Sequence, residues 1–334
     1  MMTKSRIGLF GLALAFALAA HPAKVEAQST ASAPATPSYN KPRLQVPGVY
    51  RFDVGDLHLT ALSDGSVAQD LHQLLTNTTP GEVDRWLHRS YLTNPVEASI
   101  NVYVIESGPR LVLVDTGAGE LFGPGNGGKL VSSLAAAGFR PQQITDILIT
   151  HVHSDHIGGL MADGNLVFPN ATVHVAKADV DFFLDRSNAA RTGYDIKYFD
   201  QAIKILKPYV DLGKVRTFRW TTEVLPGITA SLHPGHTPGT AFFVAESRGE
   251  KICFIGDIIH VAAVQFPRPN ITITYDLDPR NAAWVRAQNF PIFARERVLI
   301  GAPHLSFPGV GHIRGEGDGG YSWVPVDYTN RQVK

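Results

Sequence analysis

Short apolar runs and alternating apolar and polar positions, separated by glycine and proline, predict many β-strands along this chain. In the first half the predicted strands are residues 50–54, 57–62, 99–105, 111–114, 145–150 and 172–176. In the second half they are residues 215–218, 228–232, 240–245, 251–255, 298–300 and 322–326. Helical spacing predicts helices at residues 80–92, 129–137, 178–184, 196–206 and 280–296. Strands followed by helices, twice over, favour an α/β fold in which two mixed sheets pack face to face with helices outside.

The composition is that of an ordinary globular protein. The chain has 334 residues, of which 44% are hydrophobic and 18% are charged. Lys+Arg and Asp+Glu number 30 each, so the chain has no basic surplus of the kind that nucleic-acid-binding proteins carry. Because Cys253 is the one cysteine, no intramolecular disulfide can form. We therefore expect a folded protein without a nucleic-acid partner.

Residues 1–27 have the features of a secretory signal peptide. Two basic residues precede an apolar run over residues 7–20, and Val25 and Ala27 supply the small side chains that signal peptidase requires. The apolar run is short for a membrane-spanning helix, which needs about 20 apolar residues. Residues 28–48, rich in Ala, Ser, Thr and Pro, are predicted to form a flexible leader. We expect a periplasmic or secreted protein, free of the membrane after cleavage near Ala27, with an uncleaved interfacial anchor as the alternative.

Three motifs resemble active-site signatures but lack essential parts of them. Residues 123–128 match G-x-G-x-x-G, but they do not directly follow a predicted strand, and Leu130 stands where a P-loop has Ser or Thr. Residues 115–117 read Asp-Thr-Gly, as in one half of an aspartic protease site, which needs two carboxylates. Cys253 lies within an apolar strand, which favours a buried and inert thiol.

The strongest chemical signal is the segment 151–156, which reads His-Val-His-Ser-Asp-His directly after a predicted buried strand. Residues two apart in an extended segment point the same way, so we expect His151 and His153 to reach one metal ion together. Asp155 and His156 lie beyond a turn and are expected to face a second ion. Imidazole and carboxylate ligands suit zinc and its neighbours, and a site without thiolates is rarely a purely structural zinc site.

Three further candidate ligands each follow a predicted strand. They are His236, Asp257 and His304. With the first four they make seven side chains, about the number that two ions sharing a carboxylate need. His233 competes with His236 for the same role, because it lies three residues before it. Five further histidines of the predicted domain have no ligand-like context; these are His58, His72, His88, His174 and His312.

Together these motifs resemble those of the metallo-β-lactamase superfamily: His-x-His-x-Asp-His, Gly-His-Thr-Pro-Gly, Gly-Asp after a strand, and a final His. The resemblance implies one hydrolase domain over residues 49–334, with a four-layer αβ/βα sandwich and the metals at one edge of the two sheets. By motif match, it implies that His151, His153 and His236 bind one ion, that Asp155, His156 and His304 bind the other, and that Asp257 bridges them. It also implies that Asp115 supports the metal-binding loop without being a ligand.

Several segments look like the methyl parathion hydrolases and the related dihydrocoumarin hydrolase lactonases. The segments are residues 111–117, 121–124, 261–266 and 307–314. In the substrate pocket the resemblance implies roles for Phe122, Phe183, Tyr198 or Phe199, His260 and Leu74, with core packing as the alternative for each aromatic side chain. Methyl parathion hydrolase has leucine and arginine where this chain has His260 and Leu74, which favours the lactonase side of the family. The bridging Asp257 argues against a β-lactamase.

The resemblance thus predicts an exported, binuclear, metal-dependent hydrolase that opens aryl lactones or esters and has promiscuous organophosphate triesterase activity. A bridging hydroxide held by Asp155 and Asp257 is the expected nucleophile. The expected cofactors are two divalent ions, with Zn favoured and Mn, Co or Fe as alternatives. The alternatives for function are a phosphotriesterase as the main activity and an exported metal-binding module without catalysis. The expected partner is a small ester or lactone, and the resemblance suggests a homodimer.

Overall fold

The computed structural model describes residues 45–330, and the first of its two large sheets contains seven strands. In spatial order they are β1 (Val49–Val54), β2 (Leu57–Gln69), β4 (Val96–Ser107), β5 (Arg110–Val114), β6 (Asp146–Ile149), β9 (Thr172–Ala176) and β10 (Val215–Phe218). The strands from β1 to β5 pair antiparallel. From β5 to β10 they pair parallel, because helical segments separate them along the chain.

The second large sheet also contains seven strands. In spatial order they are β11 (Thr222–Leu225), β12 (Ile228–Leu232), β13 (Ala241–Ser247), β14 (Glu250–Phe254), β16 (Leu299–Gly301), β17 (Val310–Gly315) and β18 (Tyr321–Pro325). The pair β14–β16 is parallel and is connected through helix α10 (Pro279–Glu296). Two small pairs complete the strands: β3 (Leu75–Thr76) with β15 (Thr272–Ile273), and β7 (Met161–Ala162) with β8 (Asn165–Leu166).

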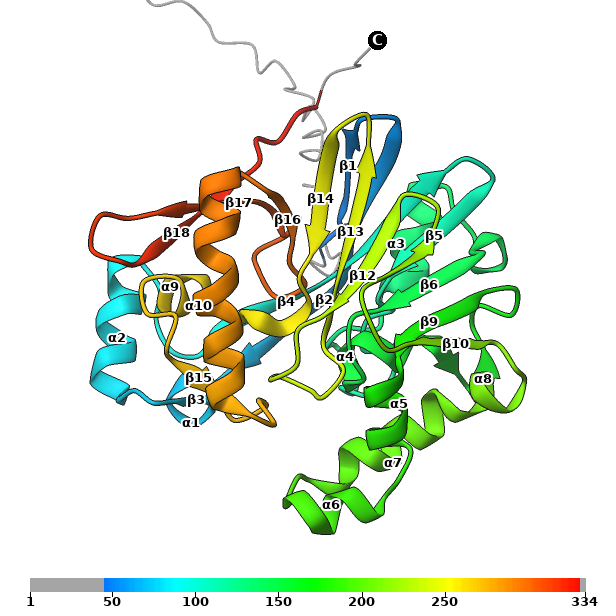
Figure 1. Ribbon diagram of the computed structural model, residues 1–334, viewed down its shortest axis with the longest axis horizontal. Helices are drawn as coiled ribbons and strands as arrows, with labels where there is room; N and C mark the ends of the chain where they lie inside the picture. The colour runs from blue at the N-terminus through cyan, green and yellow to red at the C-terminus, as the bar shows by residue number, and fades with distance from the viewer. Residues whose placement is uncertain (1–44, 331–334) are drawn as a thin grey trace, which may run out of the picture. The chain divides into compact units, whose positions relative to one another are not determined.

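The helices lie outside the two sheets. Besides α10 they are α1 (Leu71–Leu74), α2 (Pro80–Arg89), α3 (Leu130–Ala137), α4 (Ser154–Ile157), α5 (Lys177–Phe183), α6 (Ser187–Thr192), α7 (Ile196–Ile205), α8 (Lys207–Asp211) and α9 (Ala262–Gln265). Short 3₁₀ turns are η1 (Pro141–Gln143), η2 (Gly158–Leu160) and η3 (Gly256–Ile258). Figure 1 shows α10 on one side of the paired sheets and α5, α7 and α8 on the other.

The four layers follow from strands whose two faces are both apolar. In β4, Val102 and Val104 pack toward the outer helices, whereas Tyr103 and Ile105 pack into the core between the sheets. In β14, Cys253 belongs to a third core, which lies under α10. Because successive side chains of a strand point to opposite faces, each sheet buries one face against the other sheet and one against helices. This confirms the predicted αβ/βα sandwich, and Cys253 is a buried free thiol as expected.

The segments that carry the predicted metal ligands each follow a strand of these sheets. Residues 151–156 follow β6, His236 follows β12, Asp257 follows β14 and His304 follows β16. Parallel neighbours such as β14 and β16 end at the same sheet edge, so the loops that follow them lie close together. The fold therefore collects the ligands from both sheets at one edge.

Several strands differ from the sequence prediction, which contains no counterpart of β3, β7, β8, β11, β15 or β17. The predicted strand over residues 57–62 ends at Leu62, but β2 continues through Ser63, Asp64 and Gly65 to Gln69. The structure accommodates these residues as a β-bulge, at which the register to β4 shifts between Ser63 and Gly65. Strand β17 is absent from the prediction because glycines interrupt its pattern. One of them, Gly311, lies where a side chain would meet the ring of Trp323.

The predicted signal peptide and residues 28–44 of the predicted leader lie outside the described residues. Among the helices of residues 45–330, none has the length and hydrophobicity that crossing a membrane requires.

Gly159 provides a test of how tightly the metal-binding segment packs. A Cβ atom at this position would lie 2.0 Å from the carbonyl oxygen of Thr116. Overpacking of this kind costs about 1–3 kcal/mol. We expect Gly159→Ala to lower the free energy of unfolding by this amount in denaturant titrations. The control is Gly81→Ala in α2, where no atom lies within 4 Å of the added Cβ. Equal stability of the two variants would contradict the packing described.

Candidate metal centre

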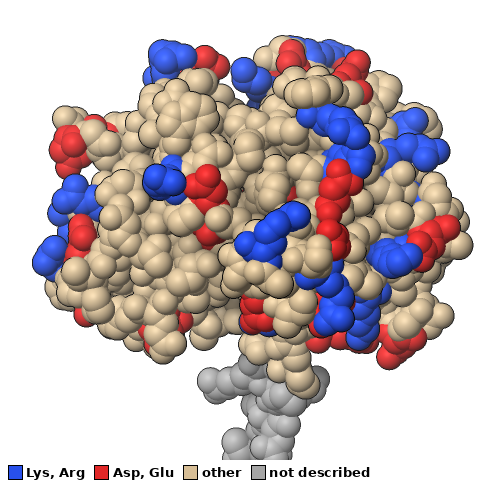
Figure 2. Space-filling model, turned by 60° about the horizontal axis from the view of Figure 1, so that its bottom comes forward, with Lys and Arg blue, Asp and Glu red and all other residues tan. Residues whose placement is uncertain are grey.

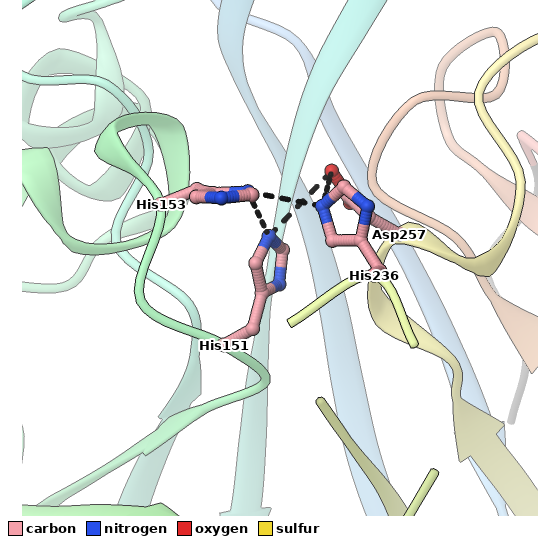
Figure 3. Close-up of side chains that lie close together, drawn as sticks. All are labelled: His151, His153, His236 and Asp257. Carbon is pink, nitrogen blue, oxygen red and sulfur yellow. Dashed lines mark hydrogen bonds and ion pairs between the residues drawn. The ribbon is translucent and has the colours of Figure 1, made fainter. Parts of the chain in front are cut away.

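Four side chains form what we call the first cluster: His151, His153, His236 and Asp257. Nδ1 of His153 lies 3.1 Å from Nε2 of His151 and 3.0 Å from Nε2 of His236. Oδ2 of Asp257 lies 3.6 Å and 3.5 Å from the Nε2 atoms of His151 and His236. Figure 3 shows these side chains converging from both sheets. As expected, His151 and His153 reach the same point from one extended segment.

The second cluster consists of Asp155, His156, His304 and again Asp257. Nε2 of His156 lies 3.2 Å from Oδ1 of Asp257, and Nε2 of His304 lies 2.9 Å from its Oδ2. Oδ2 of Asp155 lies 3.4 Å from Nε2 of His304 and 3.7 Å from Nε2 of His156. Asp257 is therefore common to both clusters. The structure brings together all seven predicted ligands in the two groups that the motifs imply.

Each imidazole of the clusters has one ring nitrogen facing inward and the other held from outside. The outer contacts are His151 Nδ1 with Thr150 Oγ1 (3.2 Å), His153 Nε2 with Tyr194 Oη (2.9 Å), His156 Nδ1 with Asp115 Oδ2 (2.9 Å), His236 Nδ1 with Asp276 Oδ1 (2.8 Å) and His304 Nδ1 with the Ser99 carbonyl (2.9 Å). Contacts of this type fix the orientation and tautomer of metal-binding imidazoles. Tyr194 and Asp276 are not among the residues predicted from the sequence.

The donor atoms and their spacing fit divalent cations. Ligand atoms about 2.0–2.1 Å from one Zn²⁺ at tetrahedral angles lie about 3.3–3.4 Å apart, close to the separations within both clusters. Among the described residues, His156 Nε2 and Asp257 Oδ1 are buried without a hydrogen-bond partner. Buried polar atoms of this kind are costly unless a cation or a proton satisfies them. The site therefore suits two metal ions, one for each cluster.

Burial and neighbouring charge determine the protonation of the clusters. Burial, together with the adjacent imidazoles, holds the pKa of His151 and of His153 well below the usual histidine value, so both rings are neutral. Burial lowers the pKa of His304, but Asp257 and Asp155 outweigh it and raise this pKa to about 9. Burial raises the pKa of Asp257, but the surrounding imidazoles outweigh it, so this carboxyl group stays ionised. Cation binding by His304 therefore requires release of its proton.

A match to a protein-family model shows to which superfamily the chain with this centre belongs. The family model for the metallo-beta-lactamase superfamily matches residues 96–304, a range that includes all seven ligands. The chain belongs to the metallo-beta-lactamase superfamily. It is a metal-dependent hydrolase of that superfamily, and its clusters suit two ions.

The chain is also similar to solved structures, one of which is described as a member of the beta lactamase superfamily. The chain is similar to the hydrolase AbOPH of the beta-lactamase superfamily, with 34% identity, a TM-score of 0.81 and coverage of 86% of this chain and 100% of that one. It is also similar to AidC, a dizinc quorum-quenching lactonase, with 27% identity, a TM-score of 0.77 and coverage of 85% and 99%.

Among the curated relatives, an N-acyl homoserine lactonase of Bacillus cereus is 25% identical over 185 residues, which are 49% of this chain and 66% of that protein. An atrochrysone carboxyl ACP thioesterase of Passalora fulva is 29% identical over 161 residues, 48% of this chain. The chain spans only 38% of the length of that thioesterase.

Two buried aspartates hold the ligand-bearing loops of this chain in place. Asp115 accepts hydrogen bonds from the backbone N–H and the hydroxyl of Thr150, both at 2.8 Å, which is the supporting role that the resemblance implies. Asp179 accepts from the backbone N–H of Val152, the hydroxyl of Thr237 and the backbone N–H of Gly239. It thereby joins the loop of His151 and His153 to the loop of His236. Burial raises the pKa of Asp179 to about 6, so it is largely ionised at neutral pH.

A third buried aspartate, Asp64, shapes the substrate side of the centre. It lies in the bulge of β2 and accepts hydrogen bonds from the backbone N–H groups of Ala118, Gly128 and Leu130, at 2.8–2.9 Å. The glycine-rich segment that resembles a nucleotide-binding motif therefore wraps around a carboxylate. Asp64 is absent from the predicted site residues because its partners are 54 to 66 residues away.

A cavity of about 530 Å³ opens directly onto both clusters. Four of the residues predicted for the substrate pocket line it: Leu74, Phe122, Tyr198 and His260. Leu121 and Tyr275 add apolar wall that the sequence analysis does not predict. Phe183 and Phe199 require a correction, because both are 0% exposed and belong to the core under the outer helices. Phe183 does not line the cavity. It packs edge-on against the ring of His153, with the two ring centroids 5.6 Å apart.

The competing histidine, His233, lies outside both clusters. Its ring stacks on Phe242 with centroids 3.7 Å apart, and its Nε2 lies 3.0 Å from the hydroxyl of Ser231. His174 is buried but pairs with Asp146 at 2.9 Å. The geometry therefore favours His236 over His233 as the ligand.

The two clusters predict the metal content of the purified protein. We expect two divalent ions per chain by inductively coupled plasma mass spectrometry. Asp257→Ala should reduce this content and remove most of the activity, because both clusters use its carboxylate. The exposed acid Asp211 on α8 provides the control Asp211→Ala, which should retain two ions. One ion per chain in the unaltered protein, or two in Asp257→Ala, would contradict the shared carboxylate.

Proposed function

We propose that this protein is an exported binuclear lactonase and arylesterase, with organophosphate triester hydrolysis as a weaker, promiscuous activity. The observation that carries the proposal is the aromatic and aliphatic cavity beside the two ligand clusters. A cavity of about 530 Å³ suits a small ligand, and its apolar walls suit an aryl or acyl group. Similarity to two lactonases supports the ring-opening chemistry.

The charges around the cavity favour a neutral substrate. Asp70 and Lys197 both line the cavity, so its charged groups away from the ligand clusters have opposite signs. Acidic and basic side chains are also mixed over the face that Figure 2 shows. Lactones, aryl esters and phosphotriesters are all neutral, so charge alone does not distinguish among them.

The site residues divide the catalytic work between them. When bound, the cations would polarise the ester oxygen and provide hydroxide at neutral pH, by lowering the pKa of water to about 7. Asp155 is the most exposed ligand, at 14%, and lines the cavity, where it would orient the nucleophile with Asp257. Phe122, Tyr198 and Tyr275 would hold the apolar part of the substrate. A cation held by the clusters would also stabilise the negative charge of the phenolate or alkoxide leaving group.

His260 is the residue that favours a lactone over a phosphotriester. It lines the cavity, is 3% exposed, and stacks on His304 with ring centroids 5.2 Å apart. Its Nε2 lies 3.2 Å from Oδ2 of Asp257, and both ring nitrogens are buried without a further hydrogen-bond partner among the described residues. The proposed role requires a small rotation of this side chain, which would turn a buried ring nitrogen toward a lactone oxygen in the cavity, and the bulk of the imidazole would crowd a tetrahedral phosphotriester.

Three parts of the proposal rest on the sequence and the resemblance alone. They are the export signal, the homodimer and the closeness to the methyl parathion and dihydrocoumarin hydrolases. A phosphotriesterase as the main activity is the second candidate, favoured by the apolar wall that alkoxy groups require. A metal-binding module is the third, and a freely accessible cavity beside the ligands argues against it.

The substrate preference can be measured directly. We expect the zinc-loaded protein to hydrolyse dihydrocoumarin and an N-acyl homoserine lactone with kcat/KM values well above that for methyl parathion, and a cephalosporin least well. A chelator should abolish all these activities. A higher kcat/KM for methyl parathion would replace the proposal with the phosphotriesterase. Two bound ions without turnover of any of the four substrates would indicate the metal-binding module.

The role of His260 predicts the direction of a specificity change. His260→Leu should raise the ratio of methyl parathion to dihydrocoumarin kcat/KM by an amount equivalent to about 1–3 kcal/mol, and adding Leu74→Arg should raise it further. His312 lies outside the cavity and its Nδ1 is 3.1 Å from the Val298 carbonyl, so His312→Leu is the control for loss of an imidazole. An unchanged ratio in His260→Leu would remove the residue-level support for the lactonase.

A further inference from the structure

Tyr194 lies in the link between α6 and α7, and its hydroxyl contacts two segments of the metal centre. Oη is 2.9 Å from Nε2 of His153 and 3.2 Å from the carbonyl oxygen of Tyr275. Tyr194 is not among the residues that line the cavity, although its ring stacks on the cavity residue Tyr198 with centroids 4.8 Å apart. Its hydroxyl therefore faces the ligands and not the substrate space.

The direction of these hydrogen bonds depends on which nitrogen of His153 carries the proton. Nδ1 is the atom that faces the first cluster, so a cation bound there requires the proton to be on Nε2. Nε2–H then donates to Oη of Tyr194, and the Tyr194 hydroxyl donates to the Tyr275 carbonyl. A hydroxyl has one proton, so the two contacts are satisfied together only in this tautomer. In the opposite tautomer, Tyr194 would donate to Nε2 and the Tyr275 carbonyl would lose its partner.

The second contact links Tyr194 to another ligand of the same cluster. Tyr275 precedes Asp276, whose Oδ1 lies 2.8 Å from Nδ1 of His236. The backbone N–H of Leu277 donates to the carbonyl of His236 at 3.0 Å, so this segment holds His236 at two points. One hydroxyl thus connects His153, which follows a strand of the first sheet, with the segment that orients His236, which follows a strand of the second.

We propose that Tyr194 is a positioning residue of the metal centre, which selects the cation-binding tautomer of His153 and aligns that ring with His236. Its effect belongs to the first cluster, because the outer partners of His156 and His304 are Asp115 and the Ser99 carbonyl. This inference concerns cation binding and does not depend on which substrate the enzyme prefers.

Tyr194→Phe removes the hydroxyl and keeps the ring, which makes it the decisive variant. In zinc competition with a chromophoric chelator, we expect one of the two ions to bind about 10–100-fold more weakly, while the other keeps its affinity to within about threefold. The matched control is Tyr209→Phe. Tyr209 is a fully buried tyrosine whose hydroxyl contacts the backbone N–H of Phe168 and the Leu160 carbonyl, both at 3.2 Å. The Tyr209→Phe variant should bind both ions with the affinities of the unaltered protein.

Unchanged affinity for both ions in Tyr194→Phe, or the same loss in Tyr209→Phe, would overturn the proposal. If the Tyr194 variant does not fold, ¹⁵N spectra of the imidazoles of the unaltered zinc-loaded protein test the same claim. The proposal requires the His153 proton on Nε2, and a proton on Nδ1 would refute it. Neither measurement uses a substrate, so failure of the lactonase proposal and failure of this one are distinguishable.

Discussion

The carboxylate of Asp257 is the group around which the centre is arranged. Its side chain is 4% exposed and lies within 3.6 Å of ligand nitrogens in both clusters. Burying an ionised carboxylate costs several kcal/mol unless positive charge compensates it. The imidazoles of both clusters lie around Asp257. They can either carry protons or bind cations, and both bring positive charge close to the carboxylate. This requirement explains why loops from both sheets converge on one residue at the end of β14.

A second set of buried acids holds the ligand-bearing loops in position. Asp115, Asp179 and Asp276 accept hydrogen bonds from loop backbone groups, hydroxyls or ligand imidazoles, and none of them points into the cavity. Hydrogen bonds to charged groups contribute about 1.5–3 kcal/mol each, so these carboxylates hold the ligand loops rigidly. Asp179 matters most for assembly, because it joins loops that follow strands of different sheets. A preorganised centre of this kind leaves the cavity walls free to vary with the substrate.

The sequence predicts the ligands better than it predicts the groups that support them. His151 to His156 lie within one short segment, so their spacing alone indicates a metal site. Asp276 and Tyr194 are 40 and 41 residues from the imidazoles that they contact, and no local pattern connects them. The choice between Tyr198 and Phe199 also requires the fold, because adjacent residues of α7 face the cavity and the core respectively. The partners of Asp64 are equally distant in sequence, and its Ser-Asp-Gly context is in addition typical of a turn and not of a bulged strand.

Anomalous diffraction from crystals of the zinc-loaded protein would show whether two cations share the Asp257 carboxylate. We expect two zinc peaks per chain, about 3.5–4 Å apart as in other two-metal hydrolases. One peak should lie among His151, His153 and His236, the other among Asp155, His156 and His304, with Asp257 between them. A single peak, or two peaks of which only one contacts Asp257, would show that the carboxylate is not shared between two cations.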